Sequence, residues 1–152
     1  MNLGILNAIG NTPMVEVSVG KVRFMAKLEC MNPFGSMKDR AAKSALLSLL
    51  QTNTIDKETT IVESSSGNFA IALSGVCSAI GIKCLCVVDS NITNTNSQII
   101  KQFGSTIHKI NTPEKNQSYQ EKRIETVKEL LRVNNNMYWT NQYNNPLIQE
   151  SY

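Results

Sequence analysis

The sequence is poor in the features on which metal sites, membrane spans and nucleic-acid surfaces depend. It has a single histidine, His108, and its four cysteines lack the paired spacing of zinc ligands. The longest apolar runs are only strand-sized, so no segment is expected to enter a membrane. Its 15 basic and 12 acidic residues are scattered, without a basic stripe interleaved with aromatics, which argues against nucleic acid as a partner.

The N-terminus also lacks a secretory pattern. Residues 1–10 contain neither a basic n-region nor a small-residue cleavage site, so a cytoplasmic protein is expected. In a reducing compartment, cysteines within apolar segments are expected to be small buried hydrophobes. This prediction covers Cys30, Cys77, Cys84 and Cys86. With 41% apolar and 18% charged residues in 152, the composition is that of one globular domain with a buried core.

Short β-branched segments alternate along the chain with segments of helical period. Two strands are predicted near the N-terminus, at 14–17 and 22–28, and Ser36 is the predicted N-cap of the helix that follows. The remaining elements alternate regularly: strands at 60–63, 83–88, 105–110 and 137–139, and helices at 68–80, 94–103 and 118–133, the last ended by asparagines in left-handed conformation. This succession predicts an α/β fold, with a mostly parallel sheet and helices on both faces.

Lys38 lies in the first turn of the first long helix, after the turn-forming string at 32–35. A lysine near the positive end of a helix dipole has its protonated form disfavoured, which favours a nucleophilic amine. Such an amine can form an imine with a carbonyl compound. Taken alone, Lys38 would be interpreted as an ordinary solvated lysine.

A polar loop follows the strand at 60–63 and consists of Ser64, Ser65, Ser66, Gly67 and Asn68. Backbone N–H groups and short hydroxyls at a helix start can hold a carboxylate. Capping of the helix alone would also select serine and asparagine here. The polar string at 141–146 follows the last strand, so it is predicted to lie at the same edge of the sheet.

Four motifs occur in order, at 10–14, 32–40, 63–73 and 141–146. They resemble those of the pyridoxal-phosphate-dependent enzymes of the cysteine synthase and tryptophan synthase β-subunit family. The resemblance implies pyridoxal 5'-phosphate as cofactor, amino acids as small-molecule substrates, and a homodimer for the full-length protein.

The resemblance also implies a domain division. Residues 1–38 would correspond to N-terminal strands of the family's larger domain, and residues 39–146 to the smaller α/β domain of the tryptophan synthase β-like fold. Residues 147–152 would be a stub of the larger domain.

Individual roles follow from the same resemblance. Lys38 would carry the cofactor and act on the Cα proton, and Asn68 would hydrogen-bond the cofactor's phenolic oxygen. The substrate α-carboxylate would be held by residues of two loops, which are Ser65, Ser66, Gly67, Asn68 and Gln142.

Within the family, the strings at 63–68 and 86–89 and the pair Tyr138-Trp139 most resemble N-(2-amino-2-carboxyethyl)-L-glutamate synthases. These enzymes join O-phosphoserine to glutamate to make a precursor of 2,3-diaminopropionate. Cysteine synthases usually carry proline where Ser64 stands, and threonine where Phe69 stands. A cysteine synthase that uses sulfide, and a non-catalytic domain that binds an anion or a partner, are the alternatives.

One family feature is missing. No glycine occurs after Gly104, so the chain cannot supply the family's glycine-rich phosphate loop, which belongs to the second half of these enzymes. We therefore expect an N-terminal fragment that binds the cofactor weakly by itself and does not turn over substrate, since the phosphate would lack its dedicated donors.

Overall fold

The computed structural model describes residues 4–113 and 115–152. The predicted segment 1–38 therefore begins with three residues that lie outside the described part. The elements, in chain order, are η1 (Gly4–Ala8), β1 (Met14–Val19), β2 (Val22–Lys27), η2 (Glu29–Met31), α1 (Lys38–Gln51), β3 (Thr60–Ser64), α2 (Asn68–Ile80), β4 (Lys83–Val88), α3 (Asn94–Gln102), β5 (Thr106–Lys109), α4 (Tyr119–Val133), β6 (Met137–Trp139) and α5 (Pro146–Gln149).

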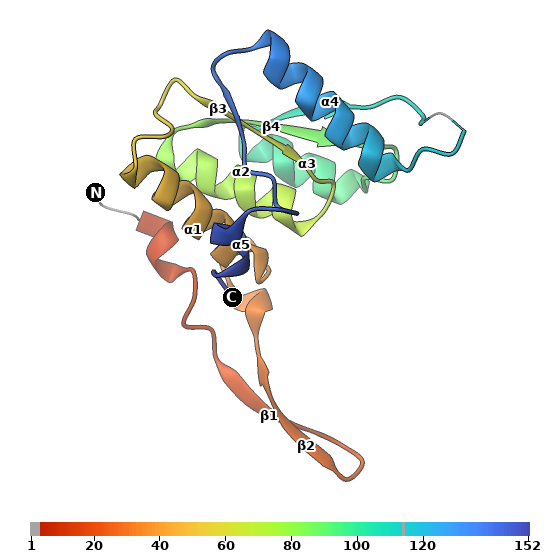
Figure 1. The fold of residues 1–152 in the computed structure, drawn as a ribbon. Coiled ribbons are helices and arrows are strands. Elements are labelled where there is room, and N and C mark those ends of the chain that lie inside the picture. Colours follow the sequence, from red (N-terminus) through yellow and green to blue (C-terminus); the bar gives the residue numbers. More distant parts are fainter. Residues whose placement is uncertain (1–3, 114) are drawn as a thin grey trace.

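A four-stranded parallel sheet forms the centre of the fold, in the order β5-β4-β3-β6. Helices α1, α2 and α3 cover one face and α4 covers the other (Figure 1). Side chains alternate between the faces, as the pleat requires. In β3, for example, Ile61 packs in the core with α1 and α2, whereas Val62 packs with Val127 of α4. The predicted fold class is confirmed.

Two predicted helix ends differ from the structure. Helix α1 is preceded by Met37 rather than capped by Ser36; the Ser36 hydroxyl instead accepts the Lys38 N–H at 3.1 Å. Asn134 ends α4 with extended backbone (φ −134°) and not in the left-handed conformation. Its side-chain amide donates to the Leu130 carbonyl at 2.9 Å, so the side chain does the capping.

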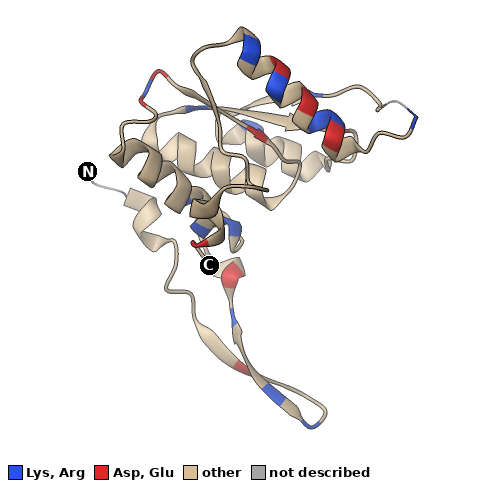
Figure 2. Ribbon diagram, viewed as in Figure 1, with Lys and Arg blue, Asp and Glu red and all other residues tan. Residues whose placement is uncertain are grey.

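Three of the four cysteines are buried as predicted, namely Cys77, Cys84 and Cys86. The prediction is wrong for Cys30, which is exposed because η2 lies at the surface where the N-terminal hairpin joins α1. Basic Lys and Arg side chains alternate with Glu side chains along α4 (Figure 2). In the part of the chain that the structure describes, no helix has the length and apolarity needed to cross a membrane.

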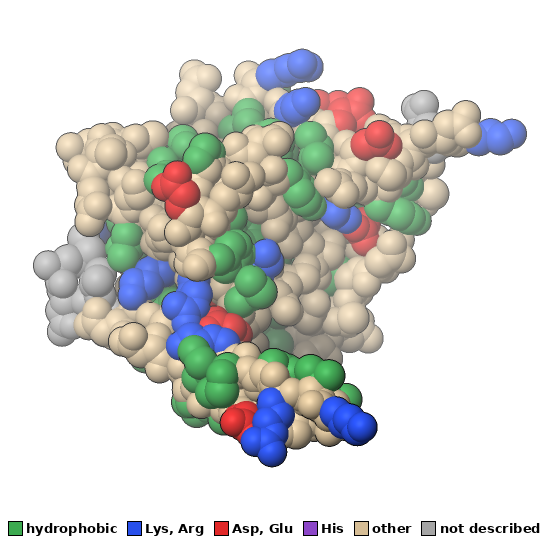
Figure 3. All heavy atoms as spheres, turned by 60° about the horizontal axis from the view of Figure 1, so that its bottom comes forward, with side chains coloured by type: hydrophobic (Ala, Val, Ile, Leu, Met, Phe, Trp, Pro, Cys, Tyr) green, Lys and Arg blue, Asp and Glu red, His purple; other side chains and the backbone are tan. Residues whose placement is uncertain are grey.

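Strands β1 and β2 form an antiparallel hairpin that projects away from the α/β body (Figure 1). Its large apolar side chains are exposed to solvent, and Figure 3 shows them beside charged groups on the projecting hairpin. Val19 and Val22 are 64% and 63% exposed, and Met25 is 57% exposed. The hairpin therefore contributes little to the core formed by the parallel sheet.

A charged network ties the base of the hairpin to α1. The Glu29 carboxylate accepts hydrogen bonds from Arg40 Nε at 2.8 Å and Nη2 at 2.9 Å, from the Thr12 hydroxyl at 2.6 Å and from Asn32 Nδ2 at 2.8 Å. These bonds, those from Arg40 foremost, lower the pKa of Glu29 from 4.5 to about 2. The ionised form of Glu29 is thus the one that stabilises this junction.

Because the folded pKa of Glu29 is depressed, its contribution to stability is present above pH 4.5 and is lost as pH falls toward 2. We expect Glu29→Gln to remove that part of the acid sensitivity. Urea unfolding between pH 7 and pH 3 measures it: the free energy of unfolding should fall less steeply in E29Q than in the wild type. The control is Glu16→Gln on the hairpin, whose Arg23 partner is 3.8 Å away and exposed. Equal slopes for wild type and E29Q would contradict this assignment.

Candidate active site

The turn before Lys38 is fixed by Asp39, which is fully buried. Asp39 Oδ2 accepts the Phe34 N–H at 2.6 Å, and burial raises the pKa of Asp39. The Phe34 ring in turn lies directly against Gly75 of α2, where an added Cβ would come within 2.4 Å of Phe34 Cε1. The start of α1 is therefore docked on α2 by a contact that requires a glycine.

Lys38 is the first residue of α1 and is half-buried. Its Nζ donates to the Tyr152 hydroxyl at 2.7 Å and lies 4.9 Å from the centre of the Tyr152 ring. Helices α1 and α2 pack side by side and begin at the same end of the molecule (Figure 1). Lys38 thus lies at the start of a helix that packs against α2, and its amine is bonded to Tyr152.

The serine loop, residues 64–68, connects β3 to α2. Ser65 is buried and its N–H donates to the Val87 carbonyl at 3.2 Å, which holds the loop against β4. Gly67 is open to solvent, since a Cβ there would meet no atom within 4 Å, and Asn68 is exposed. No side chain caps the start of α2. The loop therefore does not act as a serine N-cap, and the free backbone N–H groups at this helix start can receive an anion.

Gln142 lies beside the serine loop, as the position of its string after the last strand predicts. Its Nε2 donates to the Ser64 carbonyl at 3.0 Å, and its backbone N–H donates to Glu63 Oε2 at 3.2 Å. Glu63 is fully buried in β3, and this burial raises its pKa. The two loops that end β3 and β6 are thus hydrogen-bonded to each other.

An ion pair supports the serine loop from the α4 side. Arg123 pairs with the buried Asp89 carboxylate, which follows β4, and Arg123 Nε donates to the Ser64 hydroxyl at 3.3 Å. The Asp89 N–H donates to the Ser66 hydroxyl at 3.3 Å, and Asn96 donates to the Ser66 carbonyl at 3.1 Å. Sequence reasoning missed this pair. A charge directly after an apolar strand was the available signal.

Five of the six predicted site residues lie on the two joined loops at the carboxyl edge of the sheet. The sixth, Lys38, lies at the start of the neighbouring helix and bonds to Tyr152, near the end of the segment that contains Gln142. The roles assigned to these residues stay predictions.

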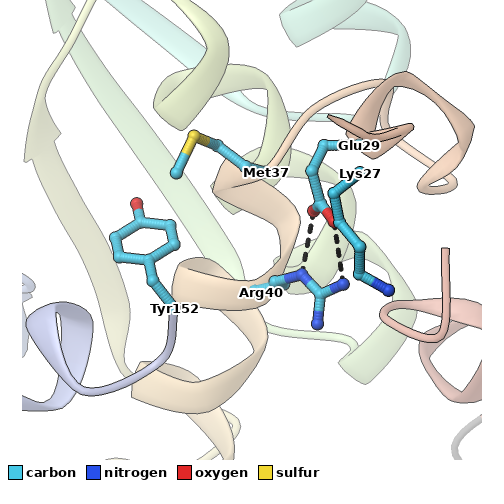
Figure 4. Close-up of a pocket in the computed structure, with 5 residues that line it drawn as sticks. All are labelled: Lys27, Glu29, Met37, Arg40 and Tyr152. Atoms are coloured by element: carbon cyan, nitrogen blue, oxygen red, sulfur yellow. Dashed lines mark hydrogen bonds and ion pairs between the residues drawn. The ribbon is translucent and has the colours of Figure 1, made fainter. Parts of the chain in front are cut away.

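A cavity of about 230 Å³ lies next to the Lys38 turn (Figure 4). It is lined by Lys27, Glu29, Met37, Arg40 and Tyr152, and none of the six predicted residues lines it. Glu29 and Arg40 form an ion pair on one side of it, and Tyr152 lies on the other (Figure 4). The charges of these two groups are paired with each other, and the Lys27 amine donates to the Thr12 carbonyl at 2.6 Å.

The parallel α/β domain has a lysine at the start of α1 and an uncapped, glycine-containing start of α2. These features are typical of proteins in which a lysine can bind a carbonyl compound and a helix start can bind an anion. The chain belongs to the pyridoxal-phosphate-dependent enzyme family, whose model matches residues 5–152.

Solved structures of family members agree with this assignment. The O-acetylserine-dependent cystathionine β-synthase of Helicobacter pylori is 30% identical, with a TM-score of 0.86 over 97% of this chain and 49% of its own. The cysteine synthase of Entamoeba histolytica is 29% identical, with a TM-score of 0.83 over 95% and 44%. A hydrogen sulfide-producing enzyme of Fusobacterium nucleatum is 26% identical, with a TM-score of 0.83 over 93% and 46%. The chain thus spans about half the length of these relatives.

The contact between Phe34 and Gly75 gives a test of how the Lys38 turn is held. Alanine normally stabilises a helix relative to glycine, but in Gly75→Ala the added methyl group collides with the Phe34 ring. We expect G75A to lower the free energy of unfolding by about 1–3 kcal/mol.

In a Phe34→Ala background the ring is absent, so the same Gly75→Ala change should be neutral or stabilising. Urea denaturation of the four proteins of this double-mutant cycle measures the reversal. Equal destabilisation by G75A in both backgrounds would show that the ring contact does not hold the turn.

Proposed function

We propose that the chain is the N-terminal part of a pyridoxal-phosphate-dependent β-replacement enzyme that acts on an amino acid with a leaving group on Cβ. One observation carries the proposal. The start of α2, at Gly67 and Asn68, has no side-chain cap, and the serine loop that leads into it is hydrogen-bonded to Gln142 through the Ser64 carbonyl. The neighbouring helix α1 begins with Lys38. Backbone N–H groups at an open helix start can hold the carboxylate of an amino acid.

The residues fit a cofactor that is bound through its carbonyl carbon. Lys38 would bind that carbon through its amine, and the exposed Asn68 side chain would donate to the phenolic oxygen. When bound, pyridoxal phosphate supplies an electron sink that stabilises negative charge at the substrate Cα. No glycine-rich segment follows Gly104. We therefore propose that the phosphate group is held by the larger domain of the complete enzyme.

The chain's own residues would orient the substrate and move a proton. Ser65, Ser66 and the Gly67-Asn68 backbone would hold the α-carboxylate, and the Gln142 amide would approach it from the other loop. A carboxylate fixed in this way presents the Cα–H bond to the Lys38 amine, which would remove the proton and later return it.

For the substrates we propose O-phosphoserine and glutamate, on the strength of the motifs at 63–68, 86–89 and 138–139. The second candidate is a cysteine synthase that uses sulfide, favoured by the likeness to the Entamoeba histolytica enzyme. The proposal includes a cytoplasmic location and a homodimer of the complete enzyme. It also treats residues 1–38 and 147–152 as parts of the larger domain, which would explain the exposed apolar hairpin.

Borohydride trapping tests the assignment of Lys38. With cofactor in excess, reduction followed by peptide mapping should label Lys38, and dialysis without reduction should release the cofactor from this chain. Lys38→Met should abolish the label, while Lys43→Met, on the same helix, should retain it. A label spread over other lysines and unchanged in K38M would favour the non-catalytic, anion-binding alternative.

A competition experiment tests the second substrate in the complete enzyme. When O-phosphoserine is offered with glutamate and sulfide together, we expect mass spectrometry to find the carbon–nitrogen product formed with glutamate. Cysteine as the main product would instead support the cysteine synthase assignment.

A further inference from the structure

Glu63 is the one acidic residue of β3 and has no exposed surface. Its neighbours Ile61 and Val62 belong to the two apolar cores on either face of the sheet. A carboxylate in such surroundings is costly unless its oxygens are hydrogen-bonded. The hydrogen-bond partners of Glu63 therefore indicate its role.

The two carboxylate oxygens have different partners. Oε1 accepts the Ser64 N–H at 2.8 Å and the Trp139 indole N–H at 3.1 Å, both from strands of the sheet. Oε2 accepts the Thr140 hydroxyl at 2.5 Å and the Gln142 N–H at 3.2 Å, both from the loop after β6. One side chain therefore joins the serine loop to the loop that carries Gln142.

The backbone of that second loop is shaped for this contact. Asn141 has φ 50°, in the left-handed region that asparagine tolerates better than most residues. This turn lets Thr140 and Gln142, two residues apart, donate to the same oxygen. The Gln142 side chain then reaches the Ser64 carbonyl.

We propose that Glu63 is the positioning residue that holds Gln142 at the serine loop and so shapes the subsite for the substrate carboxylate. The identity of the ligand, a substrate carboxylate, rests on the proposed function. The hydrogen bonds that join Glu63, Gln142 and Ser64 do not depend on it. Glu63 itself does not touch substrate; it acts through Gln142 and Ser64.

A carboxylate is required because all four donors must be accepted at once. In Glu63→Gln one oxygen becomes an NH₂ group, which faces a donor wherever it points. Placed at the Oε1 position it would oppose two N–H groups that cannot turn into acceptors. Placed at Oε2 it would oppose only the Gln142 N–H, since the Thr140 hydroxyl can rotate to accept. The second arrangement costs less, so E63Q should release Gln142 and leave Ser64 bonded.

Amide hydrogen exchange followed by NMR measures this selectivity in the 152-residue chain. In E63Q we expect exchange at the Gln142 N–H to be about tenfold faster, the scale of one lost hydrogen bond, with the Ser64 N–H unchanged. Unchanged exchange at Gln142, or equal acceleration at Ser64 and Gln142, would overturn the proposal.

A second pair of variants carries the test if E63Q does not fold. Asn141→Gly retains the left-handed turn, whereas Asn141→Ala disfavours it. Exchange at Gln142 should be about tenfold faster in N141A than in N141G. Equal exchange in the two variants would overturn the proposal, because the turn would then not be what brings Gln142 to Glu63.

Ligand binding separates this inference from the proposed function. Trp139 is the only tryptophan and donates to Glu63, so its fluorescence reports on the site. Titration with O-phospho-L-serine should give a dissociation constant about tenfold weaker in E63Q than in the wild type. If wild type and E63Q bind it equally well, the positioning role is overturned. If the wild type does not bind, the proposed carboxylate subsite fails, while the exchange data still decide whether Glu63 positions Gln142.

Discussion

The hydrogen bonds of one buried carboxylate organise the polar edge of this domain. Parallel strands end at a common edge, where the chain must leave the sheet and its backbone groups need new partners. Glu63 supplies acceptors to the residue that ends β3 and to the loop after β6, and the Arg123–Asp89 pair supports the serine loop from β4 and α4. The serine loop is thus fixed from both sides, while the start of α2 is left open. An open helix start between fixed loops is what an anion-binding site needs, because its N–H groups are then available without reorganisation.

Contacts on two sides fix the position of Lys38 at the start of α1. The turn before it is held by Asp39 inside the domain and by the Phe34 ring on Gly75, so the first residue of α1 has a fixed place on α2. On the other side, the Glu29 and Arg40 network joins the same helix to the hairpin. Through these contacts α1 connects the hairpin to the α/β body, and η1 adds a second connection through the buried Leu6. The chain covers about half the length of these relatives, and the hairpin that α1 holds keeps its large apolar side chains exposed.

The sequence predicted the fold well because each element carries a strong local signal. Strand β4 and helix α2 were predicted to the residue, since a continuous apolar run and a glycine-bounded helix leave few alternatives. The left-handed cap predicted for Asn134 was wrong because an asparagine side chain can cap the helix while its backbone stays extended. The prediction that Cys30 is buried was wrong because apolar neighbours do not reveal that a segment lies at a surface junction.

In the candidate site, Gln142 was placed correctly from its position after a strand. Asp89 could be noticed as a charge directly after an apolar strand, but the partners of Glu63, Asp89 and Arg123 lie far away in the chain, and no local pattern identifies them.

The central claim is that the start of α1 and the start of α2 form one site. NMR titration of the isotope-labelled chain with pyridoxal phosphate and O-phospho-L-serine tests it most directly. The account predicts that the amides of Lys38 and of Gly67 and Asn68 shift together, with one common concentration dependence. Shifts confined to one of the two segments, or separate saturation of each, would contradict it.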